Sequence, residues 1–367
     1  MKYQPGRMGT AEGIGLAVIM TINSVLMSSP SFILEKMGSL AWAVPFISGT
    51  IIISSLFLLA HVFNRFPGDL VSTTEQLFGK VAARVIGVYY IFAFFFQAFS
   101  LTREYSENTL LIALPYIDLD TAILWYGLGA AVIVYTGIET IARVIYLALP
   151  FIVSLILILL FTSYSLWEVN YLFPWQGYGL NQVAENSVGL SGMNVGIIIL
   201  AVLAPSFQTA RTLKAAAVFG VGGASILHSF IFVVFIMVFG LKVGTEKILP
   251  LYEIARVAYL NRYVQHIESL FIVIWVIVGI LSITACLFAG IFLLSRLANF
   301  STIRPLIPAA TFIIVEFSLL PPDLTALIKL ASKIYLSGFL GAVIFPIILF
   351  IAAIIKDRRK KACTYDQ

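Results

Sequence analysis

The chain has 367 residues, of which 60% are hydrophobic and 11% are charged. Soluble domains carry about 25% charged residues, so this composition excludes an ordinary water-soluble globular protein. The formal net charge of +5 does not indicate nucleic-acid binding, because the distribution of Lys and Arg along the chain explains it. Cys286 and Cys363 lie far apart in the sequence and predict neither a disulfide framework nor a metal site.

Ten stretches of the chain are long, apolar and nearly free of charge. A helix needs about 20 such residues to cross a bilayer, and its backbone groups must pair internally because lipid offers no partners. We therefore predict one all-α integral membrane domain, 1–367, with a basic cytoplasmic tail at 357–367. The predicted spans cover approximately 9–36, 38–64, 82–112, 121–136, 138–165, 187–211, 213–240, 264–297, 303–320 and 325–356.

An even number of spans places both termini on the same side of the membrane. Of the 23 Lys and Arg residues, 15 fall on that side, including those in the run at 356–361. Cytoplasmic segments are enriched in Lys and Arg, so both termini are predicted to be cytoplasmic. The run at 356–361 is then better explained as a topology anchor than as a binding patch. Short surface helices are predicted at 69–79 on the cytoplasmic side and within 242–266 on the outer side.

The first and sixth predicted spans are interrupted. In the first, Pro30 lacks an N–H donor and disfavours helix just before it, while Asn23, Ser24 and Ser28 can bond to the freed carbonyls. The sixth combines small, polar and helix-breaking residues, namely Gly192, Asn194, Gly196 and Pro205.

The positions of these breaks suggest the fold. If the second half of the chain starts near residue 187, the broken spans open the two halves of a five-plus-five inverted-repeat transporter fold. Matching breaks of this kind mark a binding site near the bilayer midplane. Helix ends at such a site can receive a carboxylate or an ammonium group. Two ordinary kinks are the alternative interpretation.

Polar and aromatic side chains near the breaks are the candidate ligand contacts. Thr284 and Phe288 in the eighth span are four residues apart and share a helix face. A hydroxyl in an apolar helix is often bonded to its own backbone, which is the alternative for Thr284. The full candidate set is Thr21, Asn23, Ser24, Ser28, Tyr90, Gln97, Asn194, Gly196, Thr284 and Phe288.

Several charged residues fall inside or near predicted spans, where a charge is costly and is a functional hypothesis by default. Arg103 and Glu104 are adjacent, so we expect them to contact different neighbours in an ion-pair network at the outer face. Glu316 is expected to form a structural pair with Lys329 or Lys333.

Two other polar residues have simpler interpretations. Arg143, near the cytoplasmic start of the fifth span, is expected to anchor the interface, and replacement of a coupling cation is the alternative. His228 in the seventh span is expected to pack rather than relay protons. The sequence shows no metal-binding cluster, phosphate-binding loop or nucleophile–base spacing, so we expect neither an enzyme nor a cofactor.

A series of short motifs runs through nearly the whole chain: the first span ending at Pro30, Arg65–Gly68 with Leu77–Lys80, Arg103–Glu107, Ile138–Arg143, Leu172–Pro174, Pro205 and Arg262–Trp275. Together they resemble the B subunit of the spore germinant receptors of endospore-forming bacteria. That family belongs to the amino acid–polyamine–organocation superfamily.

Two positions depart from the family pattern. The family usually has glycine in the first break, where this chain has Asn23–Ser24–Val25. An acidic residue common in the sixth span is missing near Asn194–Gly196. Both differences change the charge and the room where a ligand would bind.

The resemblance implies a subunit that senses nutrients such as amino acids or sugars in the inner membrane of the bacterial cell or spore. It also implies an A-type membrane subunit and a C-type lipoprotein subunit as partners. A proton-coupled amino-acid permease is the second hypothesis, because the fold supports it equally well. An ion-conducting subunit is less favoured, because the sequence shows no acidic ring or filter-like segment.

Overall fold

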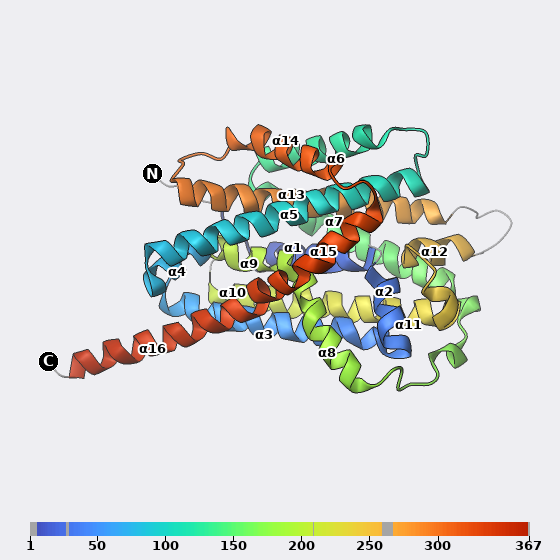
Figure 1. Cartoon of the computed structure of the whole chain (residues 1–367), viewed down its shortest axis with the longest axis horizontal. Coiled ribbons are helices and arrows are strands. Elements are labelled where there is room, and N and C mark those ends of the chain that lie inside the picture. Colours follow the sequence, from blue (N-terminus) through green and yellow to red (C-terminus); the bar gives the residue numbers. More distant parts are fainter. Residues whose placement is uncertain (1–5, 27–28, 208, 259–266, 366–367) are drawn as a thin grey trace.

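The computed structural model describes residues 6–26, 29–207, 209–258 and 267–365, and almost all of them are helical. Within these ranges the one strand-like contact is a bridge between Met8 and Phe207. Most of the long helices run roughly along the long axis of the molecule, and both ends of the chain lie toward the same end of that axis (Figure 1). We refer to this as the terminal end of the bundle and to the opposite end as the distal end.

The elements follow one another along the chain with short connections. The first half comprises α1 (Thr10–Leu26), α2 (Ser29–Met37), η1 (Gly38–Trp42), α3 (Ala43–Arg65), α4 (Leu70–Phe78), α5 (Lys80–Ile112), α6 (Leu119–Tyr135), α7 (Ile138–Thr162), η2 (Tyr164–Leu166) and η3 (Val169–Leu172). The second half comprises α8 (Leu180–Leu190), η4 (Ser191–Ile198), α9 (Ile199–Val202), η5 (Ala204–Ser206), α10 (Ala210–Ala215), η6 (Ala216–Gly222), α11 (Gly223–Gly244), α12 (Pro250–Val257), α13 (Glu268–Ala298), α14 (Leu306–Leu319), α15 (Leu324–Phe339), η7 (Leu340–Ile344) and α16 (Phe345–Tyr365).

The helices confirm an all-α membrane protein. In the described ranges, 6 helical segments are long and apolar enough to cross a membrane, or 7 if the bent pair α14 and α15 forms one span. Each of the predicted spans contains helix, but α6 and α1 are short and the sixth span is irregular. The number of ten spans therefore stays a prediction.

The helix α13 forms the centre of the bundle and packs along α5 in an antiparallel arrangement. Its residues from Leu281 to Leu293 are buried throughout. Two glycines allow the close approach, since a Cβ on Gly279 would lie 2.6 Å from the ring of Tyr105 and one on Gly290 would lie 2.5 Å from the ring of Phe95. Small residues serve the same purpose in membrane helix packing generally.

The two predicted surface helices are present. Segment 69–79 forms α4, whose first turn is capped by Asp69, because the carboxylate accepts a hydrogen bond from the Ser72 amide at 2.7 Å. Segment 242–266 contains α12 at the distal end (Figure 1). Two π-helical segments, η6 and η7, were not predicted, because hydropathy does not distinguish a π-turn from an α-turn.

Candidate functional site

The first break separates α1 from α2. Helix α1 ends at Leu26 and α2 begins at Ser29. The predicted contact Ser28 lies outside the described residues, and only the backbone of Pro30 is described. Thr21 and Asn23 are both buried, at 5% exposure.

The polar side chains of α1 have different roles. The hydroxyl of Thr21 donates to the Ala17 carbonyl and that of Ser24 donates to the Thr21 carbonyl, each at 2.8 Å. These bonds satisfy the hydroxyl donors along their own helix. The Asn23 side chain instead reaches across to α5, where its Oδ1 accepts a hydrogen bond from the Tyr105 hydroxyl at 2.8 Å.

This contact belongs to a set of buried groups that we call the distal aromatic cluster: Tyr105 and Thr109 on α5, Tyr126 on α6 and Trp275 on α13. The indole of Trp275 donates to the Thr109 hydroxyl at 3.1 Å, and that hydroxyl lies 2.9 Å from the Tyr126 hydroxyl. The rings of Tyr105 and Trp275 are 4.5 Å apart. Polar and ring contacts therefore join α5, α6 and α13, and the hydrogen bond to Asn23 attaches the end of α1 to this cluster.

The second break lies in the irregular stretch from η4 to η5 and packs against α1. Gly196 is buried there, and a Cβ at this position would lie 2.5 Å from the Met20 methyl group. The backbone of Asn194 lies in η4, but its side chain is outside the described residues. Pro205 lies in η5, which follows the short helix α9. The structure thus packs the second break against α1 at Met20, six residues before that helix ends at Leu26.

The other candidate contacts surround this region unequally. Tyr90 is buried on α5, and its hydroxyl donates to the Gly341 carbonyl of η7 at 2.7 Å. Gln97 is half-buried on the same helix. Thr284 and Phe288 are buried on α13, which packs on α1, but the Thr284 hydroxyl donates to its own helix at the Ile280 carbonyl, at 2.6 Å. The self-bonded alternative for Thr284 is therefore correct in this structure.

Among the described side chains, Ser282 has an unused polar group. It is two residues from Thr284 on α13, so the two side chains point to nearly opposite faces of the helix. Ser282 is fully buried, and its hydroxyl has no hydrogen-bond partner within the described part of the chain.

Arg103 belongs to an ion pair, as expected from the sequence. Its partner is Glu107, at 2.8 Å, because residues four apart share a helix face. Arg143 is 69% exposed and pairs with Glu139 at 3.7 Å, which agrees with an interface anchor.

The expected pair between Glu316 and Lys329 or Lys333 stays a prediction. The helices that carry these residues, α14 and α15, are bent by 110° relative to each other. Glu316 is exposed on α14. His228 is buried on α11 and stacks on Phe232 with ring centroids 5.3 Å apart, as expected for a packing residue.

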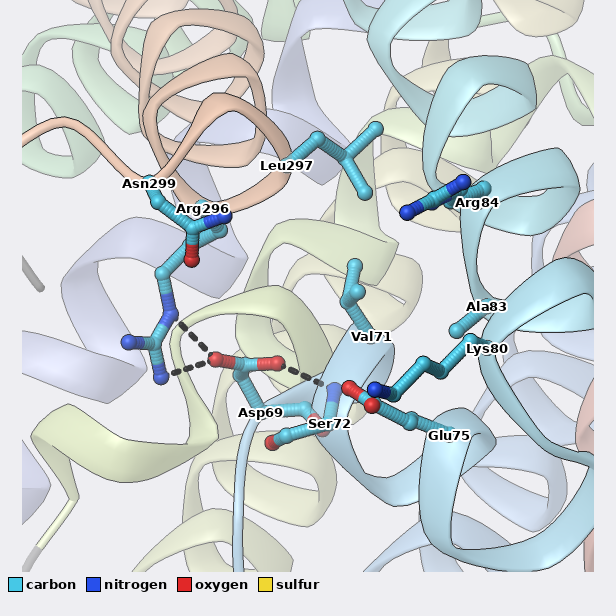
Figure 2. Close-up of a pocket in the computed structure, with 10 residues that line it drawn as sticks. All are labelled: Asp69, Val71, Ser72, Glu75, Lys80, Ala83, Arg84, Arg296, Leu297 and Asn299. Atoms are coloured by element: carbon cyan, nitrogen blue, oxygen red, sulfur yellow. Dashed lines mark hydrogen bonds and ion pairs between the residues drawn. The ribbon is translucent and has the colours of Figure 1, made fainter.

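A cavity of about 310 Å³ lies at the terminal end, between α4, α5 and α13 (Figure 2). Arg296 binds the buried carboxylate of Asp69 there and so links α13 to α4. The lining carries charges of both signs. It consists of Asp69, Val71, Ser72, Glu75, Lys80, Ala83, Arg84, Arg296, Leu297 and Asn299.

Several residues that make the observed polar contacts were not singled out from the sequence. Asp69 could have been recognised as a helix cap, because it is the first residue of the predicted helix and lies three residues before Ser72. Glu107 could have been recognised by its spacing of four from Arg103. For Tyr105, an aromatic residue among many, the sequence carries no signal that it reaches Asn23.

Solved structures identify the class of protein. Mhp1, a nucleobase-cation-symport-1 family transporter, is similar over 91% of this chain and 78% of its own, with 16% identity and a TM-score of 0.62. MhsT in complex with L-phenylalanine is similar over 95% and 89%, with 12% identity and a TM-score of 0.65. A Na⁺-coupled sialic acid symporter is similar over 92% and 79%, with 12% identity and a TM-score of 0.63. The protein therefore has the inverted-repeat fold of these transporters.

The sequence identifies the family. A family model described as spore germination protein matches residues 7–326, and the chain belongs to this family. It is also similar to spore germination protein A2 of Bacillus subtilis (strain 168), with 22% identity over 205 residues. That match spans 54% of this chain and 56% of the relative, or about half the length of each. Family and fold are those of receptors and transporters.

Proposed function

We propose that this protein is a nutrient-sensing subunit of a spore germination receptor. It binds one small ligand, an amino acid or a sugar, between the breaks of α1 and of the η4–η5 stretch. The observation that supports this most is the adjacency of the two breaks beside the buried Asn23, in a chain of the spore germination protein family. Matching breaks at the midplane are where transporters of this fold bind their substrates.

The described side chains around Asn23 suggest the kind of ligand. Thr21, Tyr105, Trp275 and Thr284 are all uncharged, so no buried side-chain charge among them would balance a net charge on the ligand. A neutral sugar, or a zwitterion whose charges meet the ends of α1 and α2, fits this surrounding best. Ser24, Asn194, Gly196, Gln97, Tyr90, Ser28 and Phe288 complete the proposed lining.

The proposed sensing mechanism is a shift between two conformations. A ligand can drive such a shift only if it binds one conformation more tightly than the other. We propose that the bond between Tyr105 and Asn23 differs between the two conformations. A ligand that binds the side-chain amide oxygen of Asn23 competes with the Tyr105 hydroxyl for this atom. We further propose that both termini are cytoplasmic, that the protein lies in the inner membrane, and that an A-type membrane subunit and a C-type lipoprotein assemble with it.

Thermal unfolding with a panel of amino acids and sugars tests the proposal. A ligand that binds the folded state at 100 times its Kd adds about 2.7 kcal/mol of stability. We expect at least one compound to raise the Tm of the wild type and to lose most of this effect in Asn23→Ala. Asn186→Ala is the control, because the Asn186 side chain bonds within its own helix near the surface. If no compound stabilises the protein, or if Asn23→Ala keeps the full shift, the proposed site is wrong.

The alternative function is a proton-coupled amino-acid permease. The observation that favours it is the likeness of the whole fold to transporters. Uptake into liposomes distinguishes the two functions: a stabilising compound that is not taken up supports a sensor. Uptake driven by a proton gradient supports the permease.

A further inference from the structure

The bend between α14 and α15 interrupts the backbone hydrogen bonds of both helices. The sequence Leu320-Pro321-Pro322-Asp323 ends one helix and begins another, and the helix axes differ by 110°. Two successive prolines cannot continue a helix. The last turn of α14 is left with carbonyl groups, and the first turn of α15 with N–H groups, that have no partner within their own helix.

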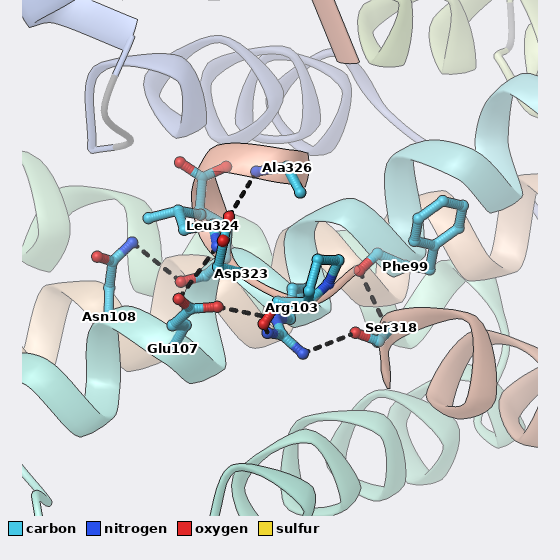
Figure 3. A network of polar contacts seen from close by, with 10 residues as sticks. Phe99, Arg103, Glu107, Asn108, Ser318, Asp323, Leu324 and Ala326 are labelled. Carbon is cyan, nitrogen blue, oxygen red and sulfur yellow. Dashed lines mark hydrogen bonds and ion pairs between the residues drawn. The ribbon is translucent and has the colours of Figure 1, made fainter. Parts of the chain in front are cut away.

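Arg103 and Glu107 on α5 provide some of these partners, and Asp323 provides another by accepting a hydrogen bond from the Ala326 amide at 2.7 Å (Figure 3). The Arg103 guanidinium donates to the Ser318 carbonyl and to the Pro322 carbonyl, each at 3.3 Å, and its side chain is only 4% exposed. The Glu107 carboxylate accepts a hydrogen bond from the Leu324 amide at 3.1 Å, and Arg103 donates to it at 2.8 Å.

The signs of the two charges match the two helix ends. A cation is favourable at the C-terminal end of a helix and an anion at the N-terminal end. Arg103 lies at the end of α14, and Glu107 lies at the start of α15. Each residue therefore acts as a cap supplied by a neighbouring helix, and the ion pair between them links the two caps. We call this pair the bend clamp.

Helix α5 also holds the other end of α15. The Tyr89 hydroxyl donates to the Ser337 carbonyl, and the Tyr90 hydroxyl donates to the Gly341 carbonyl at 2.7 Å. Tyr90 and Arg103 are 13 positions apart on α5, which corresponds to about 20 Å of helix. Both ends of α15 are thus attached to the same rigid helix.

Between these attachments, α15 lies against the second break. A Cβ on Gly338 would lie only 2.2 Å from the Gly192 carbonyl oxygen in η4, so two backbones are in direct contact. The following segment η7 also packs against η4. A displacement of α15 must therefore displace one wall of the proposed ligand site.

We propose that Arg103 and Glu107 are positioning residues for the ligand site. They cap the two helices at the bend, the caps fix the direction of α15, and α15 holds η4 in place through Gly338. The effect on ligand binding rests on the proposed function, whereas the effect on the direction of α15 does not. A simple ion pair that only stabilises the fold is the competing explanation.

A charge swap separates the two explanations. The double variant Arg103→Glu with Glu107→Arg keeps an ion pair but places a carboxylate at the end of α14 and a guanidinium at the start of α15. A simple ion pair would tolerate the swap, whereas caps of the wrong sign would not. Glu107→Gln and Arg103→Lys are milder substitutions. They replace the swap in the experiment if the swap variant does not fold. Arg143→Gln removes a matched i,i+4 pair that is exposed on α7 and serves as the control.

Two measurements are made on each variant in nanodiscs. Pulsed EPR between labels at Leu330→Cys on α15 and Val188→Cys on α8, with Cys363→Ser, reports the position of α15 relative to the second break. Both label positions are exposed. Thermal stabilisation by the compound that stabilises the wild type reports ligand affinity. We expect the swap and Glu107→Gln to shift or broaden the distance distribution and to weaken affinity about 2- to 30-fold, the range for coupling through packed networks. Arg143→Gln should do neither.

Each outcome decides between the explanations. A swap variant with wild-type distances and affinity would overturn the proposal in favour of a simple ion pair. Altered distances with unchanged affinity would show that α15 does not position the site. If no compound stabilises the wild type, the proposed function fails by itself, and the distances alone then decide whether the bend clamp exists.

Discussion

The two breaks that meet in the bundle are held in different ways. At the first break, a directional hydrogen bond from Tyr105 fixes Asn23, and the distal aromatic cluster holds Tyr105. At the second break, the described contacts are close approaches at glycines: the backbone of Gly192 meets Gly338, and Gly196 meets the Met20 side chain.

This difference predicts different sensitivities. A break held by side-chain hydrogen bonds is weakened when a polar atom is removed, because the partner is left buried and unpaired. A break held by close packing is weakened when an atom is added, because the backbone has no room to move. The two halves of the proposed site should therefore respond to opposite kinds of substitution.

The largest effect is expected at the second break. Gly338→Ala adds a methyl group against a backbone oxygen, and such overpacking costs about 1–3 kcal/mol of stability. Gly223→Ala on α11 is the matched control, because a Cβ there meets nothing within 4 Å. Thermal unfolding in detergent should show a lower Tm only for Gly338→Ala. Equal Tm values would mean that the close approach is not maintained in the membrane protein.

At the first break, removal of one atom should have a somewhat smaller effect. Tyr105→Phe removes the hydroxyl that donates to the side-chain amide oxygen of Asn23, and it should lower the free energy of unfolding by about 1–2 kcal/mol. The double variant with Asn23→Ala should cost less than the sum of the single variants, because the two residues share one bond. Unfolding free energies for the four proteins of this cycle provide the measurement, and simple additivity would contradict the observed contact.

Gly196→Ala should be milder than Gly338→Ala. Its added methyl group meets the end of the Met20 side chain, which is flexible and can move, whereas Gly338 faces a backbone atom. We expect a loss of about 1 kcal/mol or less, reduced further by Met20→Ala in the same chain. A loss as large as that of Gly338→Ala would indicate that the Met20 side chain is locked in place.

The smallest effect on stability is expected for Thr284→Val. Its hydroxyl bonds only to its own helix, so its removal should change the free energy of unfolding by about 0.5 kcal/mol or less. Thr50→Val on α3 is the control, because its exposed hydroxyl makes the same type of bond to Phe46 at 2.8 Å. A loss of ligand stabilisation in Thr284→Val alone would place Thr284 in the site. An unchanged response in both would exclude it from the ligand contacts.

Much of the fold could be predicted from the sequence, but less of the site. Hydropathy predicted the helical membrane domain, and Pro30 with Gly196 pointed to the two breaks that the structure places together. The sequence predicted that Arg103 and Glu104 contact different neighbours but did not name Glu107 as the partner of Arg103. The direction of α15 could not be predicted, because it depends on the bend of 110° after α14, which local patterns do not specify.

Chain composition and the spacing of apolar residues by themselves determined that this protein is an all-helical membrane protein, because lipid admits few other structures for such a sequence. The positions of Pro and Gly determined where the helices are interrupted, because these residues act on the local backbone. Only the tertiary structure decided which atoms meet at the interruptions: Tyr105 at Asn23, Gly338 at Gly192, and the bend clamp at the ends of α14 and α15. These contacts join residues far apart in the chain, and their geometry depends on how whole helices pack.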